Sequence, residues 1–322
     1  MKQAAPLPRP LRGIIPPMVT PLRDRDALDV EGLERLIEHI LAGGVHGLFL
    51  LGTTGEAPSL SHRLREELVE LSCRQVAGRV PVLVGITDTS FVESLELARH
   101  AAEAGAQAVV VSAPYFYASA PSELWGYLGR LAAELPLPAL LYNVPGQPSP
   151  TFDLETLRRA LQLPNVLGLK DSSGNMLYFN RARSLVAERP EWALLIGPEE
   201  LLAEALLLGA HGGVSGGANV NPRLYVELYE AAGRRDLERV NQLHRDVMRV
   251  SSTLYRVGVY ESPSAFLNAL KTSLSCLGIC NDVLAEPFER FGSAERDEVW
   301  QHLVDLGISH GRKEPVASAA GR

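Results

Sequence analysis

The chain has 322 residues, 46% of them hydrophobic and 21% charged, so it can bury a large core in one barrel-sized domain or in two smaller ones. Its 31 basic and 38 acidic side chains give a formal net charge of -7. The basic residues are scattered, which argues against a nucleic-acid or membrane surface and favours a mildly acidic soluble protein.

The cysteines and histidines indicate neither a disulfide framework nor a metal centre. Three cysteines without a Cys-x-x-Cys pair favour a reducing cytoplasm. The eight histidines form no HxH or HExxH motif, so no metal is expected, and His46 and His211 are expected to have structural roles. No apolar run of about 18 residues occurs and residues 1–10 lack an apolar signal region, so we expect neither a transmembrane helix nor a signal peptide.

From residue 13 onward one unit recurs, made of a short β-type run, a polar or glycine-rich loop and an amphipathic helical stretch. Strands that alternate with helices form a parallel sheet, so the fold class is α/β. Eight units over about 220 residues match a closed (β/α)8 barrel better than an open doubly wound sheet, for which a GxGxxG fingerprint is missing. The eight runs are residues 14–19, 47–51, 82–86, 108–112, 139–142, 166–170, 193–196 and 213–215.

After the eighth unit the pattern is helical only, and stretches 264–277 and 294–306 read as two further helices. This appendage would pack on the barrel or build a subunit contact. We therefore divide the chain into an N-terminal arm (1–12), a catalytic barrel (13–233), a C-terminal helical extension (234–307) and a disordered tail (308–322).

Lys170 ends the sixth apolar run, and turn-forming residues follow it at once, so it is expected where a buried strand meets a loop. Lysines are rarely buried without a partner, and desolvation lowers the pKa of the ammonium group. A lysine at this position can therefore supply a neutral amine for attack on a carbonyl carbon. The alternative is a structural lysine that reaches out to pair with Asp171.

In such a barrel the active site lies where the carboxyl ends of the strands meet the following loops. The second run ends in GTTGE at 52–56, where two hydroxyls and inward N–H groups suit a carboxylate. Tyr142 ends the fifth run, one strand before Lys170. Its phenol can shuttle protons to and from a carbinolamine if a hydroxyl such as that of Thr53 relays them.

Three co-linear motifs, GTTGE at 52–56, YNVP at 142–145 and GLKDS at 168–172, resemble the signatures of the dihydrodipicolinate synthase and N-acetylneuraminate lyase superfamily. The resemblance runs from about residue 13 to about residue 306 and includes the helical appendage. It implies a TIM barrel and a class I, pyruvate-dependent aldolase.

The resemblance implies that Lys170 forms an imine with pyruvate, or with a 2-oxo acid that contains it, while Tyr142 is the acid/base and Thr53 the proton relay. Thr54 and the loop N–H groups would hold the carboxylate, and no metal or organic cofactor is required. Substrate contacts are expected from Gly52, Thr54, Gly55, Gln147, Gly197, Val214 and Ser215.

Two further segments have more than one interpretation. The glycine-rich loop 213–219 resembles the family's loop beside the imine, although its glycines alone would also fit a phosphate cradle. Glu199 and Glu200 could accept hydrogen bonds from substrate hydroxyls. We favour the simpler interpretation, in which they are helix N-terminal carboxylates stabilised by the helix dipole.

Two departures from the family pattern bear on the substrate. Synthases that condense pyruvate with aspartate semialdehyde carry an arginine two residues after the YNVP motif, where this chain has the neutral Gln147. The tyrosine that such synthases place in a neighbour's active site corresponds to Phe116, although Tyr115 or Tyr117 could reach the same place. Both departures count against lysine biosynthesis.

The leading hypothesis is a Schiff-base lyase that cleaves a 2-oxo-3-deoxy sugar acid or a 4-hydroxy-2-oxo acid, or forms one from pyruvate and a small aldehyde. The alternatives are 4-hydroxy-tetrahydrodipicolinate synthase, a related 2-oxo acid dehydratase and a barrel that only binds a keto acid. The family implies a homotetramer, a dimer of dimers, with the aromatic residues 115–117 near a subunit contact.

Overall fold

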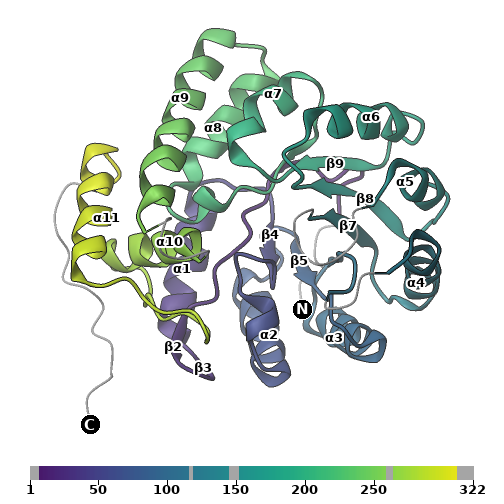
Figure 1. Ribbon diagram of the computed structural model, residues 1–322, viewed down its shortest axis with the longest axis horizontal. Helices are drawn as coiled ribbons and strands as arrows, with labels where there is room; N and C mark the ends of the chain where they lie inside the picture. Colours follow the sequence, from purple (N-terminus) through teal and green to yellow (C-terminus); the bar gives the residue numbers. More distant parts are fainter. Residues whose placement is uncertain (1–6, 116–118, 145–151, 259–263, 310–322) are drawn as a thin grey trace.

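The computed structural model describes residues 7–115, 119–144, 152–258 and 264–309. Eight short parallel strands form one sheet in the order β1, β10, β9, β8, β7, β6, β5, β4 (Figure 1). Each strand lies within one or two residues of a run expected from the sequence, except that β1 and β10 are shorter. The strands are β1 (Gly13–Ile14), β4 (Leu48–Leu50), β5 (Val82–Gly85), β6 (Ala108–Val111), β7 (Ala139–Asn143), β8 (Val166–Asp171), β9 (Ala193–Ile196) and β10 (Gly212–Gly213).

The sheet closes between its first and last strands. Gly13 of β1 pairs with Gly212 of β10 on one side. On the other side, the segment that follows β1 forms a parallel bridge between Pro17 and Phe49 of β4. The N–H group of Met18 also donates to the Phe49 carbonyl over 2.9 Å. The predicted (β/α)8 barrel is therefore confirmed.

Alternation along the strands divides the apolar residues between the barrel interior and the layer outside it. In β5, Leu83 belongs to the interior, whereas Val82 and Val84 pack outward against helices. We call the interior group the inner cluster, and Tyr142 packs against it. Its buried members are Leu11, Ile15, Phe49, Leu83, Ala108, Val110, Leu140, Leu167, Ala193, Leu195 and Val214.

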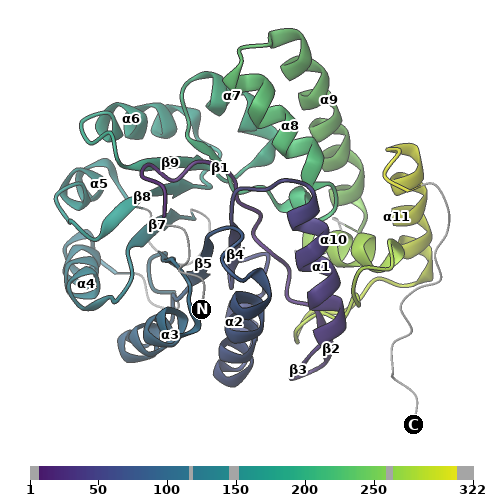
Figure 2. The same cartoon turned by 180° about the vertical axis from the view of Figure 1, so that it is seen from behind.

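Helices surround the strands, as two opposite views show (Figures 1 and 2). Most begin at a side chain that caps the first turn; Asp153, for example, accepts from the Thr156 N–H over 2.7 Å. The helix α8 begins with Asn221 as its N-cap and Pro222 at its first position, two residues that favour a helix start. The helices are α1 (Val30–Ala42), α2 (His62–Val76), α3 (Phe91–Ala104), α4 (Pro121–Glu134), α5 (Leu154–Ala160), α6 (Met176–Val186), α7 (Leu202–Leu207) and α8 (Pro222–Gly233), with short 3-10 turns η1 (Ala57–Ser59), η2 (Glu199–Leu201) and η3 (Gly216–Asn219).

Three more helices follow the barrel: α9 (Leu237–Thr253), α10 (Ala265–Cys276) and α11 (Ser293–Asp305), with the turn η4 (Leu254–Arg256) between the first two. They lie together on one side of the barrel, where α9 packs along α8 and α10 contacts η3 (Figure 1). The sequence predicted these helices but not the small hairpin of β2 (Leu22–Asp24) and β3 (Ala27–Leu28). The exact division of the chain into arm, barrel, extension and tail stays a prediction.

The two histidines that precede apolar runs do have structural roles. The Nδ1 atom of His46 accepts from the Ile14 N–H over 3.2 Å, and that of His211 accepts from the Leu194 N–H over 2.9 Å. Burial lowers the pKa of both rings, which favours the neutral form that can accept a hydrogen bond.

Within the described ranges, no helix is long and apolar enough to cross a membrane, and no cluster of three His, Cys, Asp or Glu residues could hold a metal ion.

Candidate active site

Lys170 and Tyr142 face each other near the carboxyl ends of two neighbouring strands. They are register partners in the parallel ladder between β8 and β7. The Nζ atom of Lys170 lies 3.7 Å from the centre of the Tyr142 ring and 5.1 Å from that of Phe49. Only 4% of Lys170 is exposed. The expected meeting of a lysine and a tyrosine on adjacent strands is therefore confirmed.

An extra residue in β8 turns Lys170 toward the barrel interior. Leu140 of β7 pairs with Gly168, although the residue before Leu140 pairs with Val166, so β8 is one residue longer there. Leu167 belongs to the inner cluster, and strict alternation from it would place Lys170 on the outer face. The bulge shifts the alternation by one residue and brings Lys170 inside.

Asp171 points away from Lys170, to the outer face of the strand. Its carboxylate accepts from the side-chain amide of Asn143 over 2.8 Å and from the Ser173 hydroxyl over 2.9 Å. No carboxylate in the described part of the chain forms an ion pair with Lys170. The alternative of a structural Lys170–Asp171 pair is therefore wrong, because adjacent residues of a strand face opposite sides.

Burial and the short distance between Lys170 and Tyr142 shift the pKa values of both groups. Burial lowers the pKa of Lys170 from its ordinary value of 10.5, although the neighbouring Tyr142 acts in the opposite direction. Burial raises the pKa of Tyr142, but the Lys170 charge and hydrogen bonds with Thr53 and Ser172 outweigh it, so the pKa falls below 10.0. The amine is thus neutral at a lower pH than an exposed lysine, and the neutral amine is the nucleophile.

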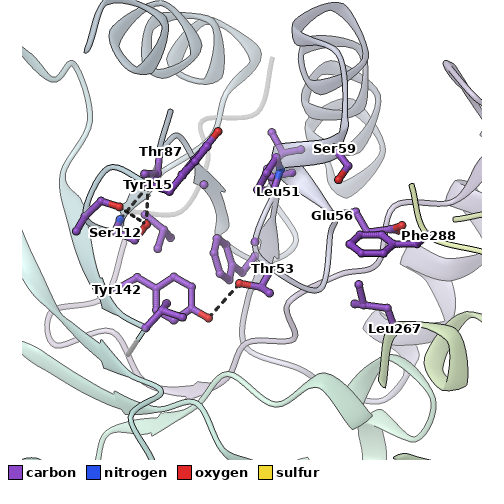
Figure 3. A pocket seen from close by; sticks show the side chains of 18 residues that line it. Leu51, Thr53, Glu56, Ser59, Thr87, Ser112, Tyr115, Tyr142, Leu267 and Phe288 are labelled. Carbon is purple, nitrogen blue, oxygen red and sulfur yellow. Dashed lines mark hydrogen bonds between the residues drawn. The ribbon is translucent and has the colours of Figure 1, made fainter. Parts of the chain in front are cut away.

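Thr53 brings a hydroxyl to the tyrosine from the loop after β4. Its Oγ1 atom lies 3.4 Å from the Tyr142 hydroxyl oxygen (Figure 3). The loop is a tight turn in which the Gly55 N–H donates to the Gly52 carbonyl and the Glu56 N–H to the Thr53 carbonyl, each over 3.0 Å. These two N–H groups are therefore engaged within the loop. Thr54 beside them is buried.

A cavity of about 400 Å³ opens over the ends of β4 to β7 and includes Gly52, Thr53 and Tyr142 in its wall. One side carries hydroxyls: Thr87 accepts from the Ser112 N–H over 2.8 Å and lies 3.2 Å from the Ser112 hydroxyl (Figure 3). Tyr115 lies on the same side. None of the described residues in the wall is a lysine or an arginine.

The opposite side of the cavity is mostly apolar, although it also carries Ser59 and Glu56, and part of it comes from beyond the barrel. Leu51 follows β4, but Leu267 lies on α10 and Phe288 lies between α10 and α11 (Figure 3). No pattern in the sequence indicated that these two residues reach the site. Such contacts join positions more than 200 residues apart, which local patterns do not report.

Several residues expected to bind substrate lie outside the described cavity wall. Val214 is in the inner cluster against which Tyr142 packs. Ser215 is fully buried, and its hydroxyl has no hydrogen-bond partner among the described residues. The Gly197 N–H donates to the Asp171 carbonyl over 2.8 Å. Gln147 lies outside the described residues, as do Phe116 and Tyr117.

Glu199 is committed to an internal network. Its carboxylate accepts from the Tyr225 hydroxyl over 2.6 Å, the Tyr255 hydroxyl over 2.8 Å and the Gly217 N–H over 2.8 Å. Glu199 does begin a 3-10 turn, as the simpler interpretation of a helix N-terminal carboxylate implies, but three donors from other elements satisfy it. These bonds tie the β9 loop to α8 and η4, and they leave little capacity for substrate hydroxyls.

A parallel eight-stranded barrel that carries a desolvated lysine and a tyrosine at adjacent strand ends has the architecture of a class I aldolase, an enzyme of the lyase class. Residues 10–305 match the model of the dihydrodipicolinate synthetase family. The chain belongs to this family.

Individual relatives agree with this assignment. A 4-hydroxy-tetrahydrodipicolinate synthase from Phenylobacterium zucineum is 33% identical over 92% of this chain and 98% of that protein. The structure of dihydrodipicolinate synthase from Bacteroides thetaiotaomicron is 51% identical, with a TM-score of 0.89 over 92% of this chain and 99% of the other. A prophage protein of the family from E. coli K12, in complex with pyruvate, is 27% identical, with a TM-score of 0.86 over 92% and 99% of the two chains.

Proposed function

We propose that this protein is a pyruvate aldolase in which Lys170 forms an imine with the keto carbon of pyruvate and joins it reversibly to a hydroxylated aldehyde. The observation that carries the proposal is the position of Lys170. Its amine is buried without a carboxylate partner in the described chain, and it lies against two rings that line the cavity.

The first half of the reaction builds the imine. The neutral Nζ atom attacks the keto carbon, and the keto oxygen takes a proton to give a carbinolamine. Loss of water then leaves a protonated imine. Tyr142 is the group that donates and accepts these protons, because the amine lies 3.7 Å from the centre of its ring and its pKa is lowered there.

The second half makes the carbon–carbon bond. The imine loses a proton from the pyruvate methyl group to give an enamine, because the cationic nitrogen stabilises the electron pair that remains. The enamine carbon attacks the aldehyde carbon, whose oxygen takes a proton from Tyr142, and Thr53 relays that proton at 3.4 Å. Hydrolysis of the new imine frees the 2-oxo acid and restores Lys170. Cleavage runs through the same steps in reverse.

Pyruvate as the donor is supported by the E. coli relative, whose structure contains it. The loop at 52–56 would hold the pyruvate carboxylate, with Thr54 as a hydroxyl donor. The hydroxyl side of the cavity and its lack of described cationic residues fit a neutral, hydroxylated aldehyde. The product would be a 2-oxo-3-deoxy sugar acid or a 4-hydroxy-2-oxo acid.

A second candidate function is that of 4-hydroxy-tetrahydrodipicolinate synthase, which the name of the 33% identical relative favours. Steady-state kinetics with pyruvate and either aspartate semialdehyde or glyceraldehyde separate the two. We expect a higher kcat/KM with glyceraldehyde. A clear preference for aspartate semialdehyde would establish the synthase, and loss of water from a 2-oxo acid without release of pyruvate would identify a dehydratase. A protein that binds pyruvate but turns over no substrate would be a keto-acid-binding barrel.

We also propose that the enzyme works in the cytoplasm as a homotetramer, a dimer of dimers, without metal or organic cofactor. The imine nitrogen supplies the electron sink that a cofactor would otherwise provide. Analytical ultracentrifugation tests the assembly, with a monomer at micromolar concentration as the contrary result. Activity that is lost on treatment with a chelator and regained with metal would refute the absence of a cofactor.

A further inference from the structure

We propose that Lys271, on α10 in the segment after the barrel, is a positioning residue for the proton relay, because its ion pair with Glu56 fixes the loop that carries Thr53. The proposal rests on the aldolase function above. It assigns a part in the catalytic step to Lys271 of α10, which belongs to none of the three motifs and is not among the residues that line the cavity.

The pair is fully enclosed. Glu56 is 2% exposed and Lys271 is 1% exposed, and the Lys271 ammonium contacts the Glu56 carboxylate directly. The other carboxylate oxygen accepts from the Ala285 N–H over 2.8 Å. The ammonium also donates to the Val283 carbonyl over 2.7 Å. Glu56 is thus held by one side chain and one backbone group of the segment after the barrel.

Glu56 transmits this constraint to the relay through its own backbone. It adopts a left-handed conformation with φ of 55°, which few non-glycine residues adopt without support from their surroundings. In that conformation its N–H group donates to the Thr53 carbonyl over 3.0 Å and closes the turn. Thr53 in turn lies 3.4 Å from the Tyr142 hydroxyl. The side chain of Glu56 therefore determines where the relay hydroxyl is held.

The Lys271 end of the pair lies on the helix that supplies part of the cavity wall. Lys271 follows Leu267 by four residues on α10, so the two are one turn apart on the same helix face. Leu267 and Phe288 form the apolar side opposite the hydroxyls (Figure 3). The ion pair thus joins the loop after β4 to the helix that supplies part of this wall.

Stability alone is a poor reason for such a pair. Two charges lose their hydration when they are buried, and replacing a buried pair by uncharged side chains is often neutral or stabilising. What the charged pair provides is a single position for the loop, since a carboxylate held by two donors has few alternative arrangements.

The test compares wild type with Lys271→Met, Glu56→Gln and the double variant. Leu274→Ala, which removes a buried apolar side chain from the same helix, is the control for lost stability. The measurements are Tm, kcat and KM, and hydrogen exchange of the peptide that spans residues 52–57. We expect both single variants to have a lower Tm than wild type, and the Tm of the double variant to return toward the wild-type value. The kcat of the double variant should stay about 10²-fold below wild type, and its loop amides should exchange faster.

Wild-type kcat and loop exchange in the double variant would overturn the proposal and leave the pair a stabilising contact only. An equal loss of kcat in Leu274→Ala at matched Tm would also overturn it. Hydrogen exchange of the loop amides is measured without substrate, so its result does not depend on the aldolase reaction. The absence of a pyruvate adduct in the wild-type protein would refute the aldolase function, whatever the loop exchange shows.

Discussion

The side-chain amide of Asn143 donates to the carboxylate of Asp171 over 2.8 Å, one residue beyond the Tyr142–Lys170 pair on the same two strands. The two pairs project to opposite faces of the sheet. The inner pair lies beside the cavity, and the outer pair ties the strand ends together behind it. The site is therefore supported by polar bonds on the side away from the substrate.

Asn143→Ala should remove this support. It leaves the buried Asp171 carboxylate short of a donor, so we expect the free energy of unfolding to fall by about 1–3 kcal/mol at pH 7. Burial already raises the pKa of Asp171 above its ordinary value of 3.8. Between pH 3.8 and that raised pKa, the folded state therefore binds more protons than the unfolded state. The loss should therefore shrink as the pH is lowered toward 3.8.

Urea denaturation at several pH values measures this difference. Asn180→Ala is the control: it loses the hydrogen bond that the Asn180 side-chain amide donates to the Met176 carbonyl on α6, and no carboxylate takes part in that bond. A pH-independent loss in Asn143→Ala equal to that of the control would show that Asp171 does not depend on Asn143.

Gly168→Ala should damage both the fold and the site. A Cβ atom at residue 168 would lie 2.3 Å from the Ala193 carbonyl oxygen on β9, so the backbone must shift at the bulge that sets the direction of Lys170. We expect a loss of at least about 1–3 kcal/mol in stability and a large fall in kcat.

Gly129→Ala on α4 is the matched control, because its added Cβ would contact nothing within 4 Å. It should stabilise the protein by about 0.5–1 kcal/mol and leave kcat unchanged. Thermal unfolding and kinetics report both quantities. Wild-type behaviour of Gly168→Ala would refute the role of the bulge.

Tyr142→Phe and Thr53→Val test the proton relay. Loss of the phenol should lower kcat by about 10²–10⁴-fold, and loss of the threonine hydroxyl should lower it less, because water can replace a relay more readily than an acid. If the two groups act in one chain, the double variant should be no slower than Tyr142→Phe. Multiplicative losses would mean that they act independently.

Lys170→Met should be inactive but more stable than wild type at pH 7, by about 1 kcal/mol, because it removes a desolvated ammonium. The pKa of Lys170 is lowered in the folded state, so between that pKa and 10.5 the unfolded chain binds more protons. Wild-type stability thus rises with pH there, and the advantage of the variant should narrow toward pH 10.5. A variant less stable than wild type at pH 7 would contradict a cost of burying Lys170.

The sequence was sufficient to predict the barrel and the close approach of Lys170 and Tyr142. Eight apolar runs separated by helical patterns set the topology, and neighbouring parallel strands bring their carboxyl ends together. The helix N-cap at Asn221 is also indicated by the sequence, because capping depends on residues only three positions apart.

The bulge was not foreseen, although a glycine in the middle of the strand at residue 168 was a local signal for it. Periodicity describes one strand, whereas a bulge is a property of two. The contacts that α10 and the segment after it make with the site could not be predicted from the sequence, for a different reason. Glu56 and Ala285 are separated by 229 positions, and only the packed fold brings them together.

The most direct test of the account is borohydride reduction in the presence of pyruvate, followed by peptide mass spectrometry, with Lys170→Ala as the control. We predict a stable pyruvate adduct on the peptide that contains Lys170, formed at neutral pH and absent from the variant. No adduct in the wild-type protein, or an equal adduct in Lys170→Ala, would contradict the imine mechanism.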